Sequence, residues 1–272
     1  MLPVGRTFYK MSGSGNDFVI VDATVQPAAE LKQPARIQAL CARATGIGAD
    51  GIVFLERSTA ADFRLTYLNS DGSPAALCGN ASLCSARLAT ELGLVSTTEF
   101  LIESDAGILG ARMLERGPEV DLQPVTDVRT ALPIGLVTGE EWIGFSQAGV
   151  PHLVVRVHDV ATVDVVGRGR PLREHSSLQH GANVNFVAQG DTGVWRIRTY
   201  ERGVEGETLA CGTGAVATAI LLAESGEVAD SVDLETRSGK VLRVRWSRRG
   251  EAWLPSLSGE ARIVFQGTFG EL

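Results

Sequence analysis

Short hydrophobic runs separated by turn residues recur along most of the chain. They are rich in valine, isoleucine, phenylalanine and tyrosine, a composition typical of β-strands. The clearest runs are FVIVD (18–22), GIVFLE (51–56), FRLTYLN (63–69), FLIESD (100–105), HLVVRV (152–157), NVNFVA (183–188), VWRIRTY (194–200) and VLRVRW (241–246). The pattern predicts a chain built mainly on β-sheet.

Three stretches have helical spacing instead. Apolar residues at positions 83, 84, 86, 88, 89 and 92 predict a helix over Ala81–Leu92. Nearly every residue of Ala215–Ala223 is apolar, as expected for a helix buried on most sides within a core. Gly93 and Gly226 follow these helices, where a left-handed residue commonly ends a helix. A third, amphipathic helix is expected at the periphery, over roughly Pro34–Ala44, and the mixture indicates an α/β (α+β) fold.

The chain also contains an internal repeat. The segment CGNASLCSARLATELGLV, which begins at Cys78, aligns with CGTGAVATAILLAESGEV, which begins 133 residues later at Cys211, and seven of the 18 positions are identical. Weaker matches at nearly the same offset follow in the same order on either side, including GAD (48–50) with GAN (181–183) and TY (66–67) with TY (199–200). Because this offset is close to half the chain length, the chain is expected to hold two copies of one domain-sized unit, with a linker near Gln123–Pro133.

Each copy carries a Cys-Gly pair at the start of its strongest helix. Asn80 and Thr213, which follow the glycines, are residue types that commonly cap helices. The positive end of a helix lowers the pKa of a thiol, and the first N–H groups of the helix form a site suited to a carboxylate. Two such sites facing each other across a cleft would place one cysteine on each side of a small carboxylate ligand. One thiolate could then remove a proton from carbon while the opposite thiol returned one to the other face.

The cysteines also admit a plainer interpretation. Cys78 and Cys211 could be small core residues at helix starts, although their recurrence in register argues against this. Cys41 and Cys84 have no counterpart in the repeat, so we expect them to be inert and buried.

Composition and charge narrow the remaining classes. The 272 residues carry a net charge of −7, which disfavours a nucleic-acid partner. Only three lysines are present, so a pyridoxal phosphate site is improbable, and neither a phosphate-binding loop nor metal-ligand spacing occurs. Because neither a signal peptide nor a membrane-spanning stretch is evident, we expect a cytoplasmic protein with no membrane partner.

Several segments are similar to those of the diaminopimelate epimerase family, a group of amino-acid racemases and epimerases that do not use pyridoxal phosphate. They are KMSGSGNDFVIVD, GIGADG, YLNSDGSPAALCGN, GVPHLVV, NVNF and YERGVEGETLACGTGA, in the family's order over both halves. The resemblance implies two pseudosymmetric domains, each a mixed sheet curled around a central helix, with the active site in the cleft between them. We expect them over residues 1–125, completed by a C-terminal strand at about 262–272, and over residues 126–261.

The resemblance also implies a set of site residues. Cys78 and Cys211 would be the acid/base pair, with His152 and Glu201 flanking the reaction centre. The positions implied to contact substrate are Asn16, Asn69, Asn183, Glu201 and Arg202, and those implied to donate hydrogen bonds to the reacting carboxylate are Gly79, Asn80, Gly212 and Thr213. Arg202 would suit a distal carboxylate because a guanidinium binds carboxylates in a bidentate fork.

The sequence departs from the family pattern at a few positions. Ala81 and Leu83 replace the glycine and arginine usual after the first CGN, and Pro74 replaces an acidic residue. Val150 stands where many members have an asparagine that helps to hold the distal carboxylate, and Gly51 replaces a glutamine seen in some members. The distal pocket is therefore expected to be more apolar than is usual, while the proton-transfer residues are intact.

The resulting hypothesis is a cofactor-independent epimerase that interconverts LL- and meso-diaminopimelate in lysine and peptidoglycan biosynthesis. A racemase of the same fold acting on another amino acid, such as histidine, is the first alternative. A non-catalytic amino-acid-binding protein or a thiol redox module using the two cysteines is the second. The expected partner is a small amino-acid substrate, and a homodimer is possible.

Overall fold

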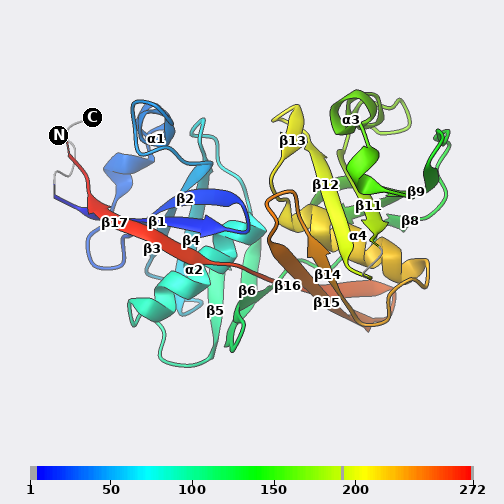
Figure 1. Cartoon of the computed structure of the whole chain (residues 1–272). Coiled ribbons are helices and arrows are strands. Elements are labelled where there is room, and N and C mark those ends of the chain that lie inside the picture. Colours follow the sequence, from blue (N-terminus) through cyan, green and yellow to red (C-terminus); the bar gives the residue numbers. More distant parts are fainter. Residues whose placement is uncertain (1–4, 191–192, 271–272) are drawn as a thin grey trace. The chain divides into compact units, whose positions relative to one another are not determined.

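The chain divides into two compact units, which we describe separately. In the computed structural model, unit 1 comprises residues 1–121 and 259–272, and unit 2 comprises residues 122–258. The described residues are 5–190 and 193–270. Both units combine a mixed β-sheet with a few helices, which confirms the predicted α/β (α+β) class (Figure 1).

Unit 1 is one sheet with a helix on each face. Its strands are β1 (Thr7–Gly13), β2 (Asn16–Asp22), β3 (Gly51–Glu56), β4 (Phe63–Asn69), β5 (Glu99–Ser104), β6 (Gly107–Leu114), β7 (Gly117–Asp121) and β17 (Arg262–Thr268). Its helices are η1 (Ala29–Lys32), α1 (Pro34–Cys41) and α2 (Gly79–Glu91). The strands pair in the order β17-β1-β2-β3-β4-β5-β6-β7, in which β2–β3 and β4–β5 are parallel and the others antiparallel.

Unit 2 repeats this pattern. Its strands are β8 (Val128–Arg129), β9 (Glu140–Ala148), β10 (Val150–Val157), β11 (Asn183–Gln189), β12 (Trp195–Glu201), β13 (Gly206–Thr208), β14 (Ser231–Glu235), β15 (Val241–Arg249) and β16 (Ala252–Gly259). Its helices are η2 (Val160–Thr162), α3 (Val165–Arg173) and α4 (Gly212–Glu224). The parallel pairs β10–β11 and β12–β14 correspond to β2–β3 and β4–β5, and the antiparallel pair β11–β12 corresponds to β3–β4.

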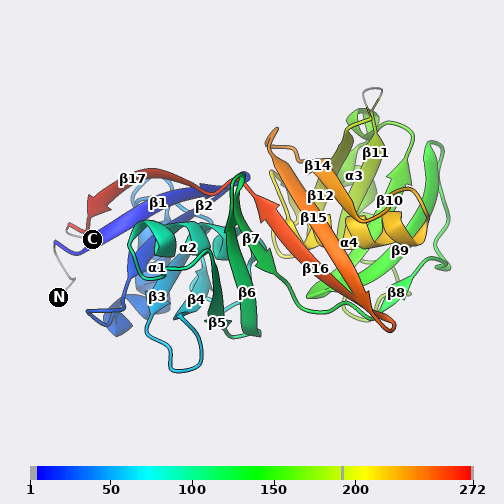
Figure 2. The same cartoon turned by 90° about the horizontal axis from the view of Figure 1, so that it is seen from below.

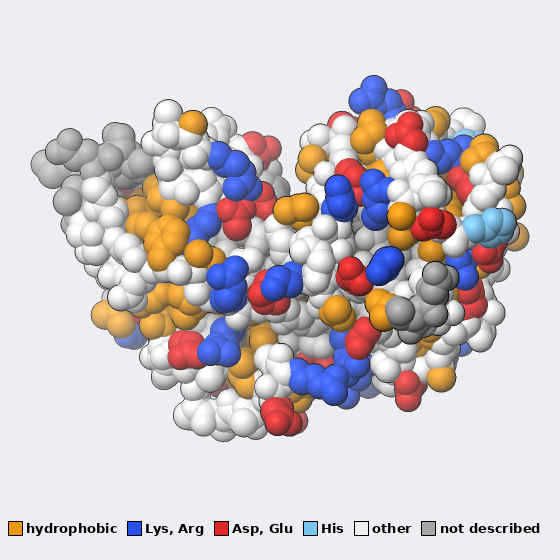
Figure 3. Space-filling view, in the orientation of Figure 1, with side chains coloured by type: hydrophobic (Ala, Val, Ile, Leu, Met, Phe, Trp, Pro, Cys, Tyr) orange, Lys and Arg blue, Asp and Glu red, His pale blue; other side chains and the backbone are white. Residues whose placement is uncertain are grey.

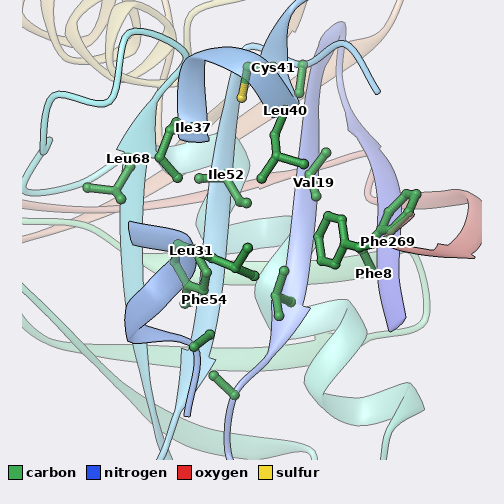
Figure 4. Close-up of a cluster of buried hydrophobic side chains, with 14 residues drawn as sticks. Phe8, Val19, Leu31, Ile37, Leu40, Cys41, Ile52, Phe54, Leu68 and Phe269 are labelled. Carbon is green, nitrogen blue, oxygen red and sulfur yellow. The ribbon is translucent and has the colours of Figure 1, made fainter. Parts of the chain in front are cut away.

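The central strands are buried on both faces because helices cover both sides of each sheet. In unit 1, a cluster that includes Phe8, Val19, Leu31, Ile37 and Ile52 fills the space between the sheet and the helices η1 and α1 (Figure 4). Helix α2 packs against strands of the same unit, among them β1, β3 and β7, and α4 packs against β9, β10, β11 and β15 (Figure 2). The nearly all-apolar sequence of α4 is explained by this placement within unit 2.

Most helix limits agree with the sequence pattern. Gly93 and Gly226 have φ of +67° and +73°, the left-handed conformation predicted after α2 and α4. Helix α1 ends at Cys41, three residues earlier than expected. The stretch expected to be a linker belongs to unit 2, since Leu122 N–H donates to Pro255 O and Val125 pairs with Trp253.

The surface of each unit carries both signs of charge. Figure 3 shows Lys and Arg side chains interspersed with Asp and Glu on the face that it displays. Many of these charges form ion pairs, such as Arg64 with Glu103 and Arg198 with Glu207. Within residues 5–190 and 193–270, no helix is long and apolar enough to cross a membrane.

Candidate active site

Each copy of the repeat places a cysteine directly at the start of its long helix. Cys78 is the N-cap of α2, with φ −130° and ψ 116°, and Cys211 is the N-cap of α4, with φ −140° and ψ 110°. The carbonyl of each cysteine accepts the first intrahelical hydrogen bond, from Ser82 N–H and Ala215 N–H at 2.9 Å. Both side chains are half-buried.

This geometry corrects the expected caps. Asn80 and Thr213 lie at the second helical position rather than at the cap, because the backbone becomes helical one residue after each cysteine. The cap residue keeps an extended backbone, so each sulfur lies beside the first turn of its helix. The first N–H groups of a helix have no intrahelical acceptor, which leaves those of Gly79, Asn80, Gly212 and Thr213 suited to an anion.

In unit 1, Asn80 belongs to a hydrogen-bonded chain that links three elements. Asn80 Nδ2 donates to Asn16 Oδ1 at 2.6 Å, and Asn16 Nδ2 donates to Asp50 Oδ2 at 2.9 Å. Arg43 holds this end of the chain through Asp50 and Asp17. Burial alone would raise the pKa of Asp17, but hydrogen bonds from Arg43 and Lys10 outweigh it and keep the pKa below its usual value. Asp17 is therefore a carboxylate at neutral pH.

The direction of this chain changes the role of Asn80. Asp50 accepts, so the Nδ2 atom of Asn16 must face it, and the Oδ1 atom of Asn16 must face Asn80. The side chain of Asn80 has therefore used one of its two N–H donors, and its Oδ1 is buried and accepts no hydrogen bond among the described residues. The amide thus has a buried acceptor, suited to an ammonium, beside the second N–H of its Nδ2.

Asn69 lies at the end of β4 and is held by a turn. Its Nδ2 donates to Ser73 Oγ at 3.0 Å, and its backbone N–H donates to Ser73 O. The same turn is linked to the Asn16 chain because Ser70 N–H donates to Asp50 O at 3.1 Å. The structure thus places Asn69 in the same part of unit 1 as Asn16, with its amide group engaged locally.

In unit 2, His152 is fully buried on β10 next to Thr213 of α4. Its Nε2 lies 3.0 Å from Thr213 Oγ1, and its Nδ1 lies 3.1 Å from Asn185 Nδ2. Burial, helped by the positive charge of Arg202, lowers the pKa of His152 to about 3. His152 is therefore neutral at physiological pH. Cys211 Sγ lies 3.6 Å from Thr213 Oγ1 and accepts a hydrogen bond from Gly214 N–H at 3.4 Å.

The strand ends of β11 and β12 carry the other expected residues of this unit. Asn183 pairs with His152 across the parallel strands, and its Oδ1 accepts from the backbone N–H of Arg202 at 2.8 Å. The guanidinium of Arg202 donates to His180 O at 3.0 Å through one nitrogen. Glu201 ends β12 and is half-buried. Asn183, Glu201 and Arg202 are therefore positioned together, next to the His152 strand.

Several residues of these networks were missed from the sequence, and three of them are central to the hydrogen-bond chains. Asn185 and Thr199 belong to the His152 network, and Asp50 fixes Asn16. One signal was present, since Asn185 is two residues from Asn183 and so faces the same side of its strand. The bonds of Asp50 and Thr199 depend on strand pairing across the sheet, which no local pattern reveals.

The two cysteines that have no cysteine counterpart in the repeat, Cys41 and Cys84, are buried, as predicted. Burial raises the pKa of Cys41 to about 11 and raises that of Cys84 as well. The structure contains all four cysteines as thiols. Among the described residues there is no group of three or more His, Cys, Asp and Glu side chains that would hold a metal ion.

Solved structures place this chain in a known class of fold. A phenazine biosynthesis protein of the PhzF family from Bacillus anthracis superposes with a TM-score of 0.76 and 18% identity, covering 98% of this chain and 99% of that one. A hydroxyproline epimerase from Agrobacterium vitis superposes with a TM-score of 0.68 and 17% identity, covering 98% and 92%. At such identities the likeness defines the fold alone.

Sequence comparisons define the family. The family model for diaminopimelate epimerase matches residues 8–128 and 145–264. The diaminopimelate epimerase of Gemmatimonas aurantiaca is 45% identical over 98% of this chain and 100% of its own length. The corresponding protein of Aquifex aeolicus is 40% identical over 97% and 98%. The chain belongs to the diaminopimelate epimerase family, and it is an isomerase of the epimerase type.

Proposed function

We propose that this enzyme interconverts LL- and meso-diaminopimelate without a cofactor, using Cys78 and Cys211 as an acid/base pair. The observation that carries the proposal is the equivalent placement of the two cysteines. Each is the N-cap of the long helix of its unit, with nearly the same backbone angles. Membership of the family and the names of the relatives support diaminopimelate as the substrate. Such a reaction would serve lysine and peptidoglycan biosynthesis.

The two-base reaction moves one proton on each face of the α-carbon. One cysteine, as thiolate, removes the α-proton and becomes a thiol, while the other, as thiol, delivers its proton to the opposite face and becomes a thiolate. The carbon is inverted, and a second proton exchange restores the starting arrangement. The helix N-termini favour both the thiolates and the negative charge that develops on the carboxylate, because they present N–H groups fixed before the reaction begins.

The surrounding residues fit the two ends of such a substrate. The N–H groups of Gly79, Asn80, Gly212 and Thr213 suit the reacting carboxylate, as proposed for the first turns of both helices. The buried Oδ1 of Asn80 and the carboxylate of Glu201 would accept from the ammonium. We assign the distal end of the substrate to Asn16, Asn69, Asn183 and Arg202. The guanidinium of Arg202 would bind the distal carboxylate.

One observation favours a second candidate. Val150 begins β10 as an exposed apolar side chain, with 37% of its surface accessible, at a position where many family members carry an asparagine. A valine cannot donate a hydrogen bond to a distal carboxylate, and it would tolerate an apolar or aromatic side chain instead. The second candidate is therefore a racemase of another amino acid, such as histidine.

Proton exchange at the α-carbon separates these candidates. The enzyme is incubated in D₂O under reducing conditions with LL- and meso-diaminopimelate, histidine, lysine, glutamate and proline, and loss of the α-proton is followed by NMR. Exchange confined to diaminopimelate is the expected result. Exchange with a different amino acid alone would favour the second candidate, and no exchange with any of them would leave a binding protein.

The same assay tests the role of each cysteine. Cys78→Ala and Cys211→Ala are each expected to abolish epimerisation, because each face of the carbon needs its own acid/base group. Cys41→Ala, which changes a buried thiol outside the repeat, is the matched control and should keep most of the activity. Near-normal turnover in both directions by either of the first two variants would rule out the two-base mechanism.

A further inference from the structure

We propose that Asn185 is a positioning residue, which fixes the ring proton of His152 so that Thr213 donates its hydroxyl proton to Cys211. The inference rests on the proposed use of Cys211 as an acid/base group. It concerns a chain of hydrogen bonds that runs from β12 through β11 and β10 to the start of α4. Its members are Thr199, Asn185, His152, Thr213 and Cys211.

The orientation of the Asn185 amide is determined by the backbone. Its Nδ2 lies 3.0 Å from Leu153 O, which can only accept, so the nitrogen rather than the oxygen must face that carbonyl. The Oδ1 atom then accepts from Thr199 Oγ1 at 2.9 Å. The second hydrogen of Nδ2 points to His152 Nδ1 at 3.1 Å.

The amide in turn determines the tautomer of His152. A ring nitrogen that accepts a hydrogen bond carries no proton, so Nδ1 is bare and the neutral ring must carry its proton on Nε2. The ring is neutral because it is fully buried and faces the charge of Arg202. His152 Nε2–H therefore donates to Thr213 Oγ1, which lies 3.0 Å away.

The chain ends at the sulfur of Cys211. Since Thr213 Oγ1 accepts from His152, its own proton is left for Cys211 Sγ, at 3.6 Å. Gly214 N–H donates to the same sulfur at 3.4 Å. Two donors directed at one sulfur favour its thiolate form, because hydrogen bonds to a charged group stabilise that form. In this arrangement His152 positions Thr213 and does not itself exchange a proton with the substrate.

The matching positions of unit 1 show that the fold does not require this chain. Strand pairing aligns β3 and β4 with β11 and β12 one residue away from the sequence repeat, which had set Tyr67 on Tyr200. In this structural alignment Phe18 occupies the position of His152, and Val53 opposite Tyr67 occupies that of Asn185 opposite Thr199. Phe18 and Tyr67 pack edge to face, with ring centroids 6.0 Å apart. Unit 1 thus builds the same part of its core without a histidine and an asparagine. Buried polar groups are costly unless all are satisfied, so their presence in unit 2 points to a role beyond packing.

The first test replaces Asn185 by aspartate. A carboxylate at this position accepts a hydrogen bond from Nδ1–H, so the ring proton moves to Nδ1. The bare Nε2 then accepts a hydrogen bond from the hydroxyl of Thr213, which no longer donates to the sulfur. Gln189→Glu is the matched control, because it makes the same amide-to-acid change at the exposed end of the same strand. The readout is the rate of iodoacetamide alkylation of Cys211 against pH, followed by peptide mass spectrometry, with Cys78 as internal reference.

The expected result is specific to one sulfur. In Asn185→Asp, the midpoint of Cys211 alkylation should rise by about one pH unit, a roughly ten-fold loss of thiolate near neutral pH, consistent with the loss of one hydrogen bond to a charged group. The midpoint of Cys78 should stay the same, and Gln189→Glu should change neither. An unmoved Cys211 midpoint in a folded Asn185→Asp protein would overturn the proposal.

A second pair of variants serves if Asn185→Asp does not fold. Thr213→Val removes the hydroxyl while keeping the shape, and Thr213→Ser keeps the hydroxyl. The Cys211 midpoint should rise in the first and return toward the wild-type value in the second. Equal midpoints in the two variants would contradict a role for the hydroxyl.

Nitrogen NMR of the wild-type protein tests the tautomer directly. With ¹⁵N-labelled histidine, His152 should be neutral with its proton on Nε2, and it should stay so down to about pH 5, because its pKa lies far below the usual value. A proton on Nδ1, or an imidazolium in this range, would overturn the inference. Alkylation and NMR need no substrate, so they fail or succeed independently of the proposed reaction, which the exchange assay tests alone.

Discussion

The four cysteines differ in chemistry because of the positions that the chain gives them. Cys78 and Cys211 lie at helix starts, half-buried and beside helix N–H groups. Cys41 ends α1 and Cys84 lies in the interior of α2, and both are buried among apolar side chains. A thiolate is favoured at the positive end of a helix and disfavoured by desolvation, so the same residue type falls into two classes.

This difference predicts selective alkylation. At about pH 8 under reducing conditions, iodoacetamide should label Cys78 and Cys211 within minutes and leave Cys41 and Cys84 unlabelled, because burial raises the pKa of the latter two. For Cys41, whose pKa is about 11, less than about one molecule in a hundred is a thiolate at that pH. Peptide mass spectrometry after a short pulse measures the labelling. Denatured protein, which should label at all four positions, is the control, and fast labelling of Cys84 in the folded state would contradict the prediction.

How far single residues could be predicted depended on whether their role is local. The repeat singled out Cys78 and Cys211, since a helix start is a local feature. The direction of the Asn80 amide could not be read in the same way, because it is imposed by Asp50 through Asn16. The resemblance suggested a side-chain donor at Asn80, and only the folded chain shows that Asn16 takes one of its two N–H groups and that its Oδ1 accepts no hydrogen bond among the described residues.

At the scale of the helix, the third residue after each cysteine distinguishes the two units. Gly214 in α4 lies against Asn185, and a Cβ at this position would collide with Asn185 Oδ1 and approach Cys211 Cβ at 3.2 Å. In α2 the equivalent residue is Ala81, which is buried. In unit 1 the residue equivalent to Asn185 is Val53, so an apolar side chain lies where unit 2 has an amide. The apparent departure at Ala81 from the family pattern is therefore matched by the apolar core beneath it.

Gly214→Ala should disturb both the stability and the chemistry of unit 2. The added methyl group must displace Asn185 or tilt the start of α4, and overpacking of this kind costs about 1–3 kcal/mol. We expect a lower midpoint of chemical unfolding and a higher alkylation midpoint for Cys211. Gly226→Ala is a useful comparison, because no atom lies within 4 Å of the added Cβ and only the positive φ of +73° is strained. If Gly214→Ala left both the unfolding midpoint and Cys211 alkylation unchanged, the close packing described here would be wrong.

Strands with continuous or regularly alternating hydrophobic residues were found from the sequence. Strands β2, β3, β10 and β11 are buried on both faces, so their runs are unbroken. Strand β16 was missed because Pro255 lies within it, and a proline argues against a strand interior. Strand β9 was missed because Gly144 interrupts its pattern. There the missing side chain makes room for α4, since a Cβ would lie 2.6 Å from Leu221 Cδ2.

At the scale of the whole molecule, the chain leaves unit 1 after β7 and returns to it only at residue 259. Strand β17 then pairs antiparallel with β1, from Thr7 opposite Thr268 to Ser12 opposite Arg262. Phe265 and Phe269 pack on Phe8, with ring centroids 6.0 Å and 5.0 Å apart. Unit 1 is therefore completed by the last part of the chain, whereas unit 2 is formed from one continuous segment.

This path predicts that removal of residues 259–272 damages one unit more than the other. Loss of β17 exposes the edge of β1 and uncovers Phe8, so unit 1 loses both strand hydrogen bonds and apolar burial. Hydrogen exchange followed by mass spectrometry should show loss of protection across β1, β2 and β3, while β9, β10 and β11 keep theirs.

A circular permutant provides the matched control: it opens the chain between Ser258 and Gly259 and joins the original ends by a short flexible linker, so that β17 precedes β1. Gly5 N–H donates to Phe269 O at 2.9 Å, so a linker that replaces residues 1–4 and 271–272 has little distance to span. The permutant should restore protection in unit 1. Equal loss of protection in both units of the truncated chain would mean that the two do not fold separately, and failure of the permutant would mean that the strand must arrive last.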